Sequence, residues 1–387
     1  MIRLPSPRIA AIQLGLNLGL FIAMVQTAAN TPGKLLNDFI IFWAAAKLAL
    51  GGHALSVYDL QSLTSVVASS SHASHIHGGW YYPPAYLLLL LPLGLLNYVP
   101  AWLLFSSLST LLYLVSLSRV VARRDALLWL LAYPGLWLNL YSGQNGLLSL
   151  SLLALAMHWQ PSRPVRAGIP LGLLIIKPHL GILLPFWLMQ QRAWRTMAAT
   201  TLTVLVLIGV STFAFGTTLW TGFLQGLMHG GSYLLDNIPL TRLASTYALI
   251  RSTGGTVTCA LLTHACTALV GLAAAAWIWC HTSSRNISLA GLIAATLLVS
   301  PYLYDYDAIW LLLALVCLLR EIDATGWRPG EKLWVGLAWF SPLYPLVLSW
   351  VVPVGVIQLT PALNIALLLL LLRRTRTAQL PIASVTT

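Results

Sequence analysis

The sequence predicts an all-α integral membrane protein that crosses the bilayer about twelve times. Hydrophobic residues make up 58% of the 387 residues, charged residues only 8%, and the mean hydropathy is +0.81. Soluble proteins carry about 25% charged residues, so a soluble fold does not fit this composition. Apolar stretches of about 20 residues, the length that crosses a bilayer, recur from residue 9 almost to the end of the chain.

The net charge of +12 indicates membrane topology rather than nucleic-acid binding. Most arginines lie in short loops or near the chain ends, and placing these on one side of the membrane satisfies the positive-inside rule. This arrangement predicts an even number of crossings with both termini in the cytoplasm. Five cations remain for the outer side or the membrane interior: Lys34, Lys47, Lys177, Arg242 and Arg251.

The predicted spans differ in regularity. The clearest lie over residues 9–28, 98–118, 195–215, 257–280, 331–349 and 352–372. Less regular spans are predicted near residues 125–140, 144–160, 287–301 and 304–320.

Proline interrupts two apolar regions and prevents a continuous helix through each. Lys177-Pro178 divides residues 166–190 into two pieces that are too short for a simple span, and four prolines divide residues 81–118. Non-helical backbone at membrane depth is tolerated only where it is buried in protein or lines a wet cavity. The two breaks therefore predict a cavity near the outer face.

Two outer segments, residues 29–82 and 216–256, are too long to be simple turns. The first contains a short apolar helix over residues 39–50, which is expected to lie at the membrane interface, and the second contains the outer arginines. We expect both segments to cover the functional site. Nothing marks a separate soluble domain, so residues 1–387 are predicted to form a single polytopic domain.

Only nine residues are Asp or Glu, which leaves few candidates for a proton acceptor. Four are interpreted as solvated charges of cytoplasmic loops: Asp125, Glu321, Asp323 and Glu331. The other five fall on the outer side: Asp38, Asp59, Asp236, Asp305 and Asp307. A charge close to the bilayer is costly and is usually kept for function. Asp38 directly precedes the run FIIFWAAA, so it is either a helix N-cap, a functional carboxylate, or both, whereas Asp59 is interpreted as a turn or cap residue.

Lys177 lies among apolar residues at a helix break, with His179 two positions later. An ammonium group in this setting needs an anionic partner, for which phosphate is the natural candidate; the alternative is a lysine that extends its charge to the interface. Arg242 and Arg251 can clamp a phosphate with paired hydrogen bonds, or can be ordinary loop charges or contacts to lipid headgroups.

Other polar side chains lie near predicted helix ends. Gln144 and Asn145, in YSGQNGLL, can hydrogen-bond a sugar or satisfy a kinked backbone. Asp305 and Asp307, in SPYLYDYD, are expected at the cavity rim, and their spacing does not favour a paired-carboxylate mechanism. The spacing of three outer histidines fits no zinc signature, so no metal site is predicted; these are His72, His75 and His77.

Five motifs occur in the order typical of glycosyltransferase family 87, which the chain resembles over roughly residues 9 to 375. They are DFIIFWAAAKLALGGHALSVYDL, YYPPAYLLLLLPLGLL, GQNGLLSLSLLALA, KPHLGILLPFWLMQQRAWR and SPYLYDYDAIW. The family belongs to the C-type (GT-C) polytopic superfamily and is related to polyprenol-phosphate-mannose-dependent mannosyltransferases. The resemblance implies a GT-C-type bundle in a bacterial inner membrane.

The resemblance also implies inverting transfer of a sugar from a polyprenyl-monophosphate donor, at an extracytoplasmic site, without an obligatory metal or other cofactor. The acceptor would be a glycan or a glycolipid. Asp38 matches the acid in the first outer loop of the family, which would be the general base. Such transfer needs a base for the acceptor hydroxyl and cations for the departing phosphate. The expected phosphate-binding residues are Lys177, His179, Arg242 and Arg251, and the expected substrate-binding residues are Tyr82, Gln144, Asn145, Asp305 and Asp307.

The chain departs from the family at Tyr306 and Asp307, where members often carry histidines. If those histidines hold the donor phosphate, other groups must do so here, such as Lys177, His179 or Arg242. The alternative function is a transporter or flippase for a lipid-linked or anionic solute, because broken helices and a lysine at membrane depth also occur in carriers. The absence of a second-half counterpart to the Asp38 and Lys177 segments favours the enzyme. A family member that has lost activity and serves as an assembly partner is a third alternative.

Overall fold

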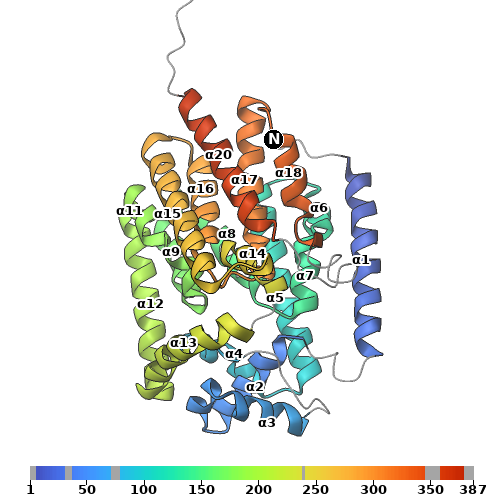
Figure 1. Cartoon of the computed structure of the whole chain (residues 1–387), viewed down its shortest axis with the longest axis vertical. Coiled ribbons are helices and arrows are strands. Elements are labelled where there is room, and N and C mark those ends of the chain that lie inside the picture. The colour runs from blue at the N-terminus through green and yellow to red at the C-terminus, as the bar shows by residue number, and fades with distance from the viewer. Residues whose placement is uncertain (1–5, 31–36, 71–78, 238–239, 345–357, 379–387) are drawn as a thin grey trace, which may run out of the picture. The chain divides into compact units, whose positions relative to one another are not determined.

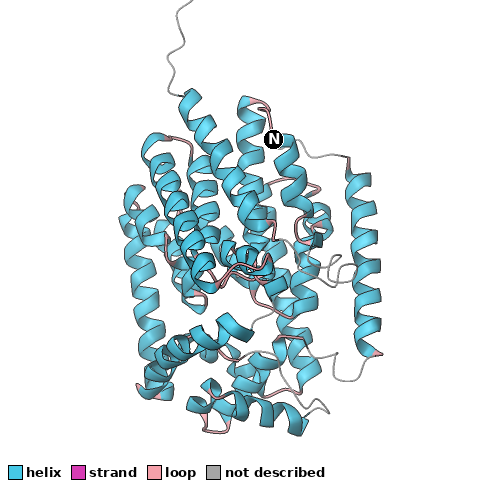
Figure 2. Ribbon diagram, viewed as in Figure 1, coloured by secondary structure: helices cyan, strands magenta, loops and turns pink. Residues whose placement is uncertain are grey.

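A computed structural model describes residues 6–30, 37–70, 79–237, 240–344 and 358–378. Helices and the loops between them account for these residues, and no β-strand occurs in the described ranges (Figure 2). The one isolated bridge that the structure records there joins Leu243 and Tyr304 in antiparallel fashion. The predicted all-α class is confirmed.

The chain divides into two compact units, which are described separately. The N-terminal unit comprises residues 5–181 and 193–239, and the C-terminal unit comprises residues 1–4, 182–192 and 240–387.

The helices of the N-terminal unit follow one another along the chain, and most carry a label in Figure 1. They are α1 (Pro7–Ala29), α2 (Phe39–Leu50), η1 (Ala54–Tyr58), α3 (Leu60–Ser70), α4 (Pro84–Gly94), α5 (Tyr98–Val121), α6 (Ala126–Ala132), α7 (Pro134–Ser142), α8 (Gly146–Trp159), α9 (Pro164–Leu173), η2 (Leu174–Ile176), α10 (Pro178–Gly181), α12 (Trp194–Phe215) and α13 (Thr218–Asn237).

The C-terminal unit is built in the same way from α-helices and short 3-10 helices. They are α11 (Leu184–Gln190), η3 (Leu240–Arg242), α14 (Thr246–Ser252), α15 (Val257–His281), α16 (Arg285–Val299), η4 (Asp305–Trp310), α17 (Leu311–Thr325), α18 (Glu331–Phe340) and α20 (Thr360–Ala378).

Four of the described helices are long and apolar enough to cross a membrane: α1, α5, α12 and α15, with 21 to 25 residues each. They coincide with four of the clearest predicted spans. Large apolar side chains project from them, and Phe213 on α12 is 95% exposed. Such exposure is costly in water and is expected where a helix faces lipid. Shorter apolar helices of 10 to 17 residues accompany them, so the predicted count of twelve crossings stays a prediction.

Several irregular spans are divided where proline or a tight turn interrupts the backbone. The predicted span over 125–140 is two helices, α6 and α7, because Pro134 follows an extended Tyr133 (φ −71°, ψ 122°). The predicted span over 304–320 begins with the 3-10 helix η4 before α17. The spans predicted over 331–349 and 352–372 extend into residues 345–357, outside the described residues, and α20 begins at Thr360.

The predicted break at Lys177-Pro178 is confirmed. After α9 the chain makes the 3-10 turn η2, and Lys177 adopts a non-helical backbone (φ −135°, ψ 76°) before α10 begins at Pro178. Pro178 disfavours the helical conformation at the residue before it, Lys177. The sequence therefore leaves Lys177 at a junction between two short helical pieces.

The core of the N-terminal unit is built around two apolar helices. All eight residues from Phe39 to Ala46 of α2 are buried, as are nearly all residues of α8. Gly168 allows α9 to approach α12 closely, because an added Cβ would lie 2.4 Å from the Cβ of Ala199. The start of α2 and the start of α8 therefore both belong to buried helices.

Candidate functional site

Asp38 is the residue immediately before α2. Its backbone is helical (φ −59°, ψ −17°), and its side chain makes no capping hydrogen bond. The neighbouring Asn37 makes the local side-chain contact to the helix start instead, because its Oδ1 accepts a hydrogen bond from the Phe39 backbone N–H at 3.2 Å. The carboxylate of Asp38 is therefore directed to tertiary partners rather than to the end of its own helix.

The Gln144 amide bridges Asp38 and Tyr82. Its Nε2 donates to Oδ2 of Asp38 at 3.1 Å, and its Oε1 accepts from the Tyr82 hydroxyl at 3.3 Å. Gln144 is 8% exposed, whereas Asp38 is half-buried. Three predicted site residues from distant parts of the sequence thus form one hydrogen-bonded chain within the N-terminal unit.

The backbone fixes this arrangement. The Asp38 N–H donates to the Ser142 carbonyl at 3.0 Å, which ties the start of α2 to the end of α7. Gly143 ends α7 in the left-handed conformation (φ 64°), and an added Cβ would lie 2.4 Å from Oδ1 of Asn37. Only glycine combines that conformation with so close an approach.

An aromatic cluster adjoins the site at Tyr82. Phe42, Trp80, Tyr82 and Tyr86 form a cluster with ring centroids 5.0 to 6.2 Å apart. The Tyr58 hydroxyl donates to the Tyr82 carbonyl at 3.0 Å and fixes the backbone of that residue. Such rings supply large, rigid apolar surface beside the carboxylate.

Asn145 follows Gln144 but lies in a different environment. It is fully buried near the Tyr86 hydroxyl, and the structure records no hydrogen bond of normal geometry for either polar group. The suggestion that Asn145 satisfies a kinked backbone is not supported by its side-chain contacts.

Lys177 and His179 flank the helix break of the N-terminal unit. Lys177 is only 2% exposed, whereas a lysine that extends its ammonium group to an interface keeps that group accessible. A buried ammonium group requires a compensating polar or anionic environment. The burial of Lys177 is consistent with its predicted role toward an anion.

Arg242 and Asp305 come together in the C-terminal unit, where Nη2 of Arg242 lies 3.5 Å from Oδ1 of Asp305. The guanidinium group also lies 5.6 Å from the centroid of the Tyr306 ring, which stacks on Tyr304. A backbone hydrogen bond from Ala244 to Leu303 holds the two segments together. Arg242, a predicted phosphate-binding residue, therefore pairs with Asp305, a predicted substrate-binding residue.

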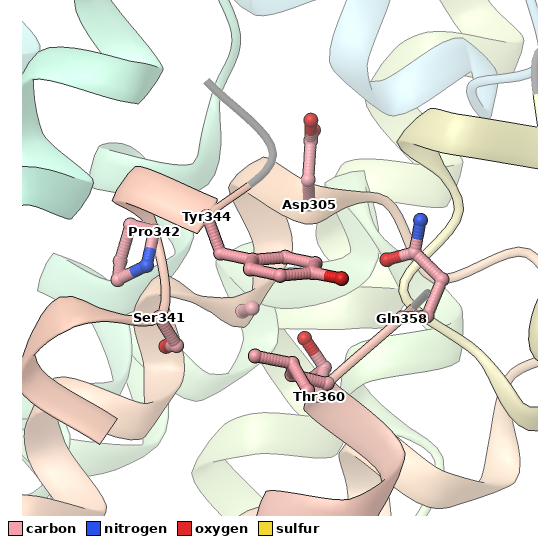
Figure 3. Close-up of a pocket in the computed structure, with 8 residues that line it drawn as sticks. Asp305, Ser341, Pro342, Tyr344, Gln358 and Thr360 are labelled. Atoms are coloured by element: carbon pink, nitrogen blue, oxygen red, sulfur yellow. The ribbon is translucent and has the colours of Figure 1, made fainter. Parts of the chain in front are cut away.

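A small cavity lies beside Asp305 (Figure 3). Its volume is about 10 Å³, and its lining includes Asp305, Tyr344, Gln358 and Thr360. That volume holds about one water molecule and no sugar. Gln358 donates to the carbonyls of Leu240 and Thr241, so it supports the backbone beside Arg242.

The remaining predicted residues have varied environments. Arg251 donates from Nη1 to the Gly255 carbonyl at 2.8 Å, close to the end of α14. Asp307 is buried within η4. The prediction for Asp59 is confirmed: its Oδ2 accepts from the N–H and hydroxyl of Ser62, and these bonds lower the pKa of the carboxyl group. The three outer histidines lie outside the described residues, namely His72, His75 and His77.

The prediction for Glu331 was wrong. Glu331 was expected to be a solvated loop charge, but it is fully buried and receives hydrogen bonds from Nε and Nη2 of Arg374 at 2.6 and 2.8 Å. The partner lies 43 residues further along the chain, on α20. Local sequence around Glu331 carries no signal for such a distant partner.

These observations define a helical membrane protein with a carboxylate-centred polar site in its N-terminal unit. The family model described as glycosyltransferase family 87 matches residues 80–301, more than half of the chain. The chain belongs to glycosyltransferase family 87, which confirms the resemblance and indicates glycosyltransferase activity. The matched range includes Tyr82, Gln144 and Lys177, whereas Asp38 precedes it. No curated protein and no solved structure matches the chain.

Proposed function

We propose that this protein is an inverting glycosyltransferase that moves a sugar from a polyprenyl-monophosphate donor to a glycan or glycolipid acceptor. The sugar is mannose or another hexose or a pentose. The observation that carries the proposal is the Asp38 carboxylate, held by Gln144 and Tyr82 beside an aromatic cluster, in a chain of this family.

In this reaction the acceptor hydroxyl attacks the anomeric carbon in line with the departing phosphate. A new C–O bond forms as the bond to the phosphate breaks, and the phosphate leaves with the electron pair. Asp38 receives the hydroxyl proton and is the general base. The donor is already activated, so the reaction needs no redox cofactor, and fixed cations can stabilise the departing phosphate without a metal.

The cations proposed for the phosphate lie in different environments. Lys177 is buried at a helix break, where an ammonium group interacts with an anion more strongly than in water. His179 lies on the adjoining helix α10. Arg242 interacts with Asp305, so a phosphate there would compete with that carboxylate, and Arg251 donates to a backbone carbonyl.

The proposed location is the bacterial inner membrane, with both termini in the cytoplasm and the site on the extracytoplasmic side. The donor's lipid tail would remain in the bilayer, next to exposed apolar helix surfaces such as that of α12. Segments 29–82 and 216–256 would cover the site. This arrangement accounts for a polar site within a chain built mainly of apolar helices.

A transporter or flippase is the second candidate, and the broken helix at Lys177-Pro178 is the observation that favours it. Interrupted helices with a charged residue at the break are typical of carriers for anionic substrates. The two candidates differ in their product: a new glycosidic bond in one case, and a relocated but unchanged donor in the other.

The test is sugar transfer by the purified protein in proteoliposomes. Radiolabelled polyprenyl-phosphate mannose, glucose and arabinose would be offered with a crude lipid and glycan extract, and wild type compared with Asp38→Asn. Product from wild type but not from Asp38→Asn, with donor binding retained, supports the enzyme and its base. Asp125→Asn is the matched control, since Asp125 pairs with Arg123 in a loop.

Equal transfer by wild type and Asp38→Asn would move the base to Asp305, Asp307 or Asp59. Movement of labelled donor across the bilayer without sugar transfer would support the flippase and contradict the glycosyltransferase.

A further inference from the structure

We propose that Gln144 is a positioning residue for Asp38: its amide, oriented by Tyr82, holds the carboxylate in place and does not bind the sugar. This inference deepens the proposed function and rests on Asp38 being the base. It gives Gln144 and Tyr82 a different role from the substrate contact that the sequence suggests.

The partners of Gln144 define the orientation of its amide. A carboxylate accepts hydrogen bonds, so the amide nitrogen must face Asp38; a phenol can donate, so the amide oxygen faces Tyr82. The distances are 3.1 and 3.3 Å. Each end of the amide already has one partner, and only 8% of Gln144 is exposed, which restricts the access of a ligand to the remaining N–H and lone pair.

The backbone of Gln144 is equally constrained. Its N–H donates to the Asn139 carbonyl at 3.2 Å, closing the turn that ends α7. The preceding Gly143 packs against Asn37, and Ser142 accepts from the Asp38 N–H. The amide and the carboxylate are therefore joined through the backbone as well as through their side chains.

Tyr82 lies at the end of the hydrogen-bonded series that runs from Asp38 through Gln144. Its ring lies 5.2 Å from Phe42 and 5.0 Å from Tyr86, and its carbonyl accepts from the Tyr58 hydroxyl at 3.0 Å. Burial raises the pKa of Tyr58 above its ordinary value, so this hydroxyl keeps its proton and remains a donor. Tyr82 thus has a fixed position from which to orient Gln144.

A general base must lie within hydrogen-bond reach of the proton that it removes, at a defined angle. A hydrogen bond to one carboxylate oxygen restricts rotation of the carboxylate and so maintains that angle. Misplacement of a reacting group by about 1 Å can cost about 100-fold in rate. Loss of the Gln144 amide should therefore reduce kcat and leave substrate binding intact.

The experiment compares kcat and KM of sugar transfer for wild type, Gln144→Met, Tyr82→Phe and the double variant. We expect Gln144→Met to lower kcat about 10- to 100-fold with KM for donor and acceptor unchanged. Tyr82→Phe should lower kcat less, since the amide still reaches Asp38. The double variant should match Gln144→Met, because Tyr82 acts through Gln144. Gln13→Met is the matched control, since Gln13 bonds to Asn17 on α1.

A raised KM with unchanged kcat in Gln144→Met would make Gln144 a substrate-binding residue and overturn the inference. If the loss of kcat in the double variant equals the product of the two single losses, the two residues act independently, which also overturns the inference. If Gln144→Met does not fold, Tyr82→Phe decides: lower kcat at constant KM supports the inference, and unchanged kcat contradicts it. Failure of the proposed function is distinct, because wild type would then transfer no sugar or Asp38→Asn would match it.

Discussion

Arg374 and Glu331 form a fully buried ion pair that joins the start of α18 to α20 in the C-terminal unit. Two hydrogen bonds connect the guanidinium group and the carboxylate, and Arg374 also donates to the Gly326 carbonyl at 2.9 Å. Glu331 accepts a further bond from the Arg328 N–H at 2.8 Å. The pair thus also fixes the turn between α17 and α18.

Breaking this pair from one side should be strongly destabilising. Arg374→Met leaves the Glu331 carboxylate buried without its cation, which typically costs about 3–5 kcal/mol. We expect a clearly lower thermal unfolding temperature in detergent. Adding Glu331→Leu to Arg374→Met should recover part of the loss, since both charges are then removed. A double variant as unstable as the single would show that the hydrogen bonds to the turn matter more than the charges.

Gly143→Ala should abolish most of the transfer activity. The substitution places a Cβ 2.4 Å from Oδ1 of Asn37 and also strains a left-handed backbone, which costs about 1–2 kcal/mol. Displacement of Asn37 moves the adjoining Asp38. Gly52→Ala is the matched control, because Gly52 has φ 81° with nothing within 4 Å of an added Cβ. If both variants lose activity equally, backbone strain rather than the clash with Asn37 is responsible.

Asp305→Asn and Arg242→Met should change donor binding in opposite directions, if Arg242 binds the donor phosphate as proposed. Removing the competing carboxylate leaves Arg242 more available, so the donor KM should fall. Removing the guanidinium group should raise it. The pair is partly exposed, so each effect should be limited to about 1 kcal/mol, or about fivefold. Initial-rate measurements at varied donor concentration decide; an unchanged KM in both variants would exclude Arg242 from the donor site.

Asp59→Ala should remove a pH-dependent contribution to stability. Hydrogen bonds from Ser62 lower the pKa of Asp59 in the folded protein, so its contribution is present above the ordinary Asp pKa and is lost as pH falls through the lowered value. Loss of such a helix cap costs about 1 kcal/mol or less, since this carboxylate is solvated. Unfolding curves of wild type and Asp59→Ala should differ at neutral pH and converge in acid.

The sequence predicted those parts of the fold that depend on local composition. Long apolar runs located α1, α5, α12 and α15, and the Lys177-Pro178 pair located the helix break. Pro134 was an equally local signal for the division between α6 and α7. An apolar run with a single proline was nevertheless interpreted as one span.

The site could be predicted only as a set of residues. Asp38, Gln144 and Tyr82 were each candidates, but Gln144 and Asp38 are 106 residues apart, and their contact depends on how α2 and α7 pack. The two glycines near Gln144, in YSGQNGLL, indicate an unusual backbone there but do not specify its partner. The burial of Glu331 had no comparable local signal, because Arg374 lies on another helix.

The tie between Asp38 and Ser142 has a consequence for biogenesis. A ribosome makes the start of α2 long before it makes the end of α7, and domains form from the N-terminal side during synthesis. Asp38 therefore leaves the ribosome before the carbonyl and the amide that later hold it have been made. The carboxylate acquires its final setting only after Gln144 has been synthesised and α7 has docked, so a nascent chain arrested before that residue contains the proposed base but not the site.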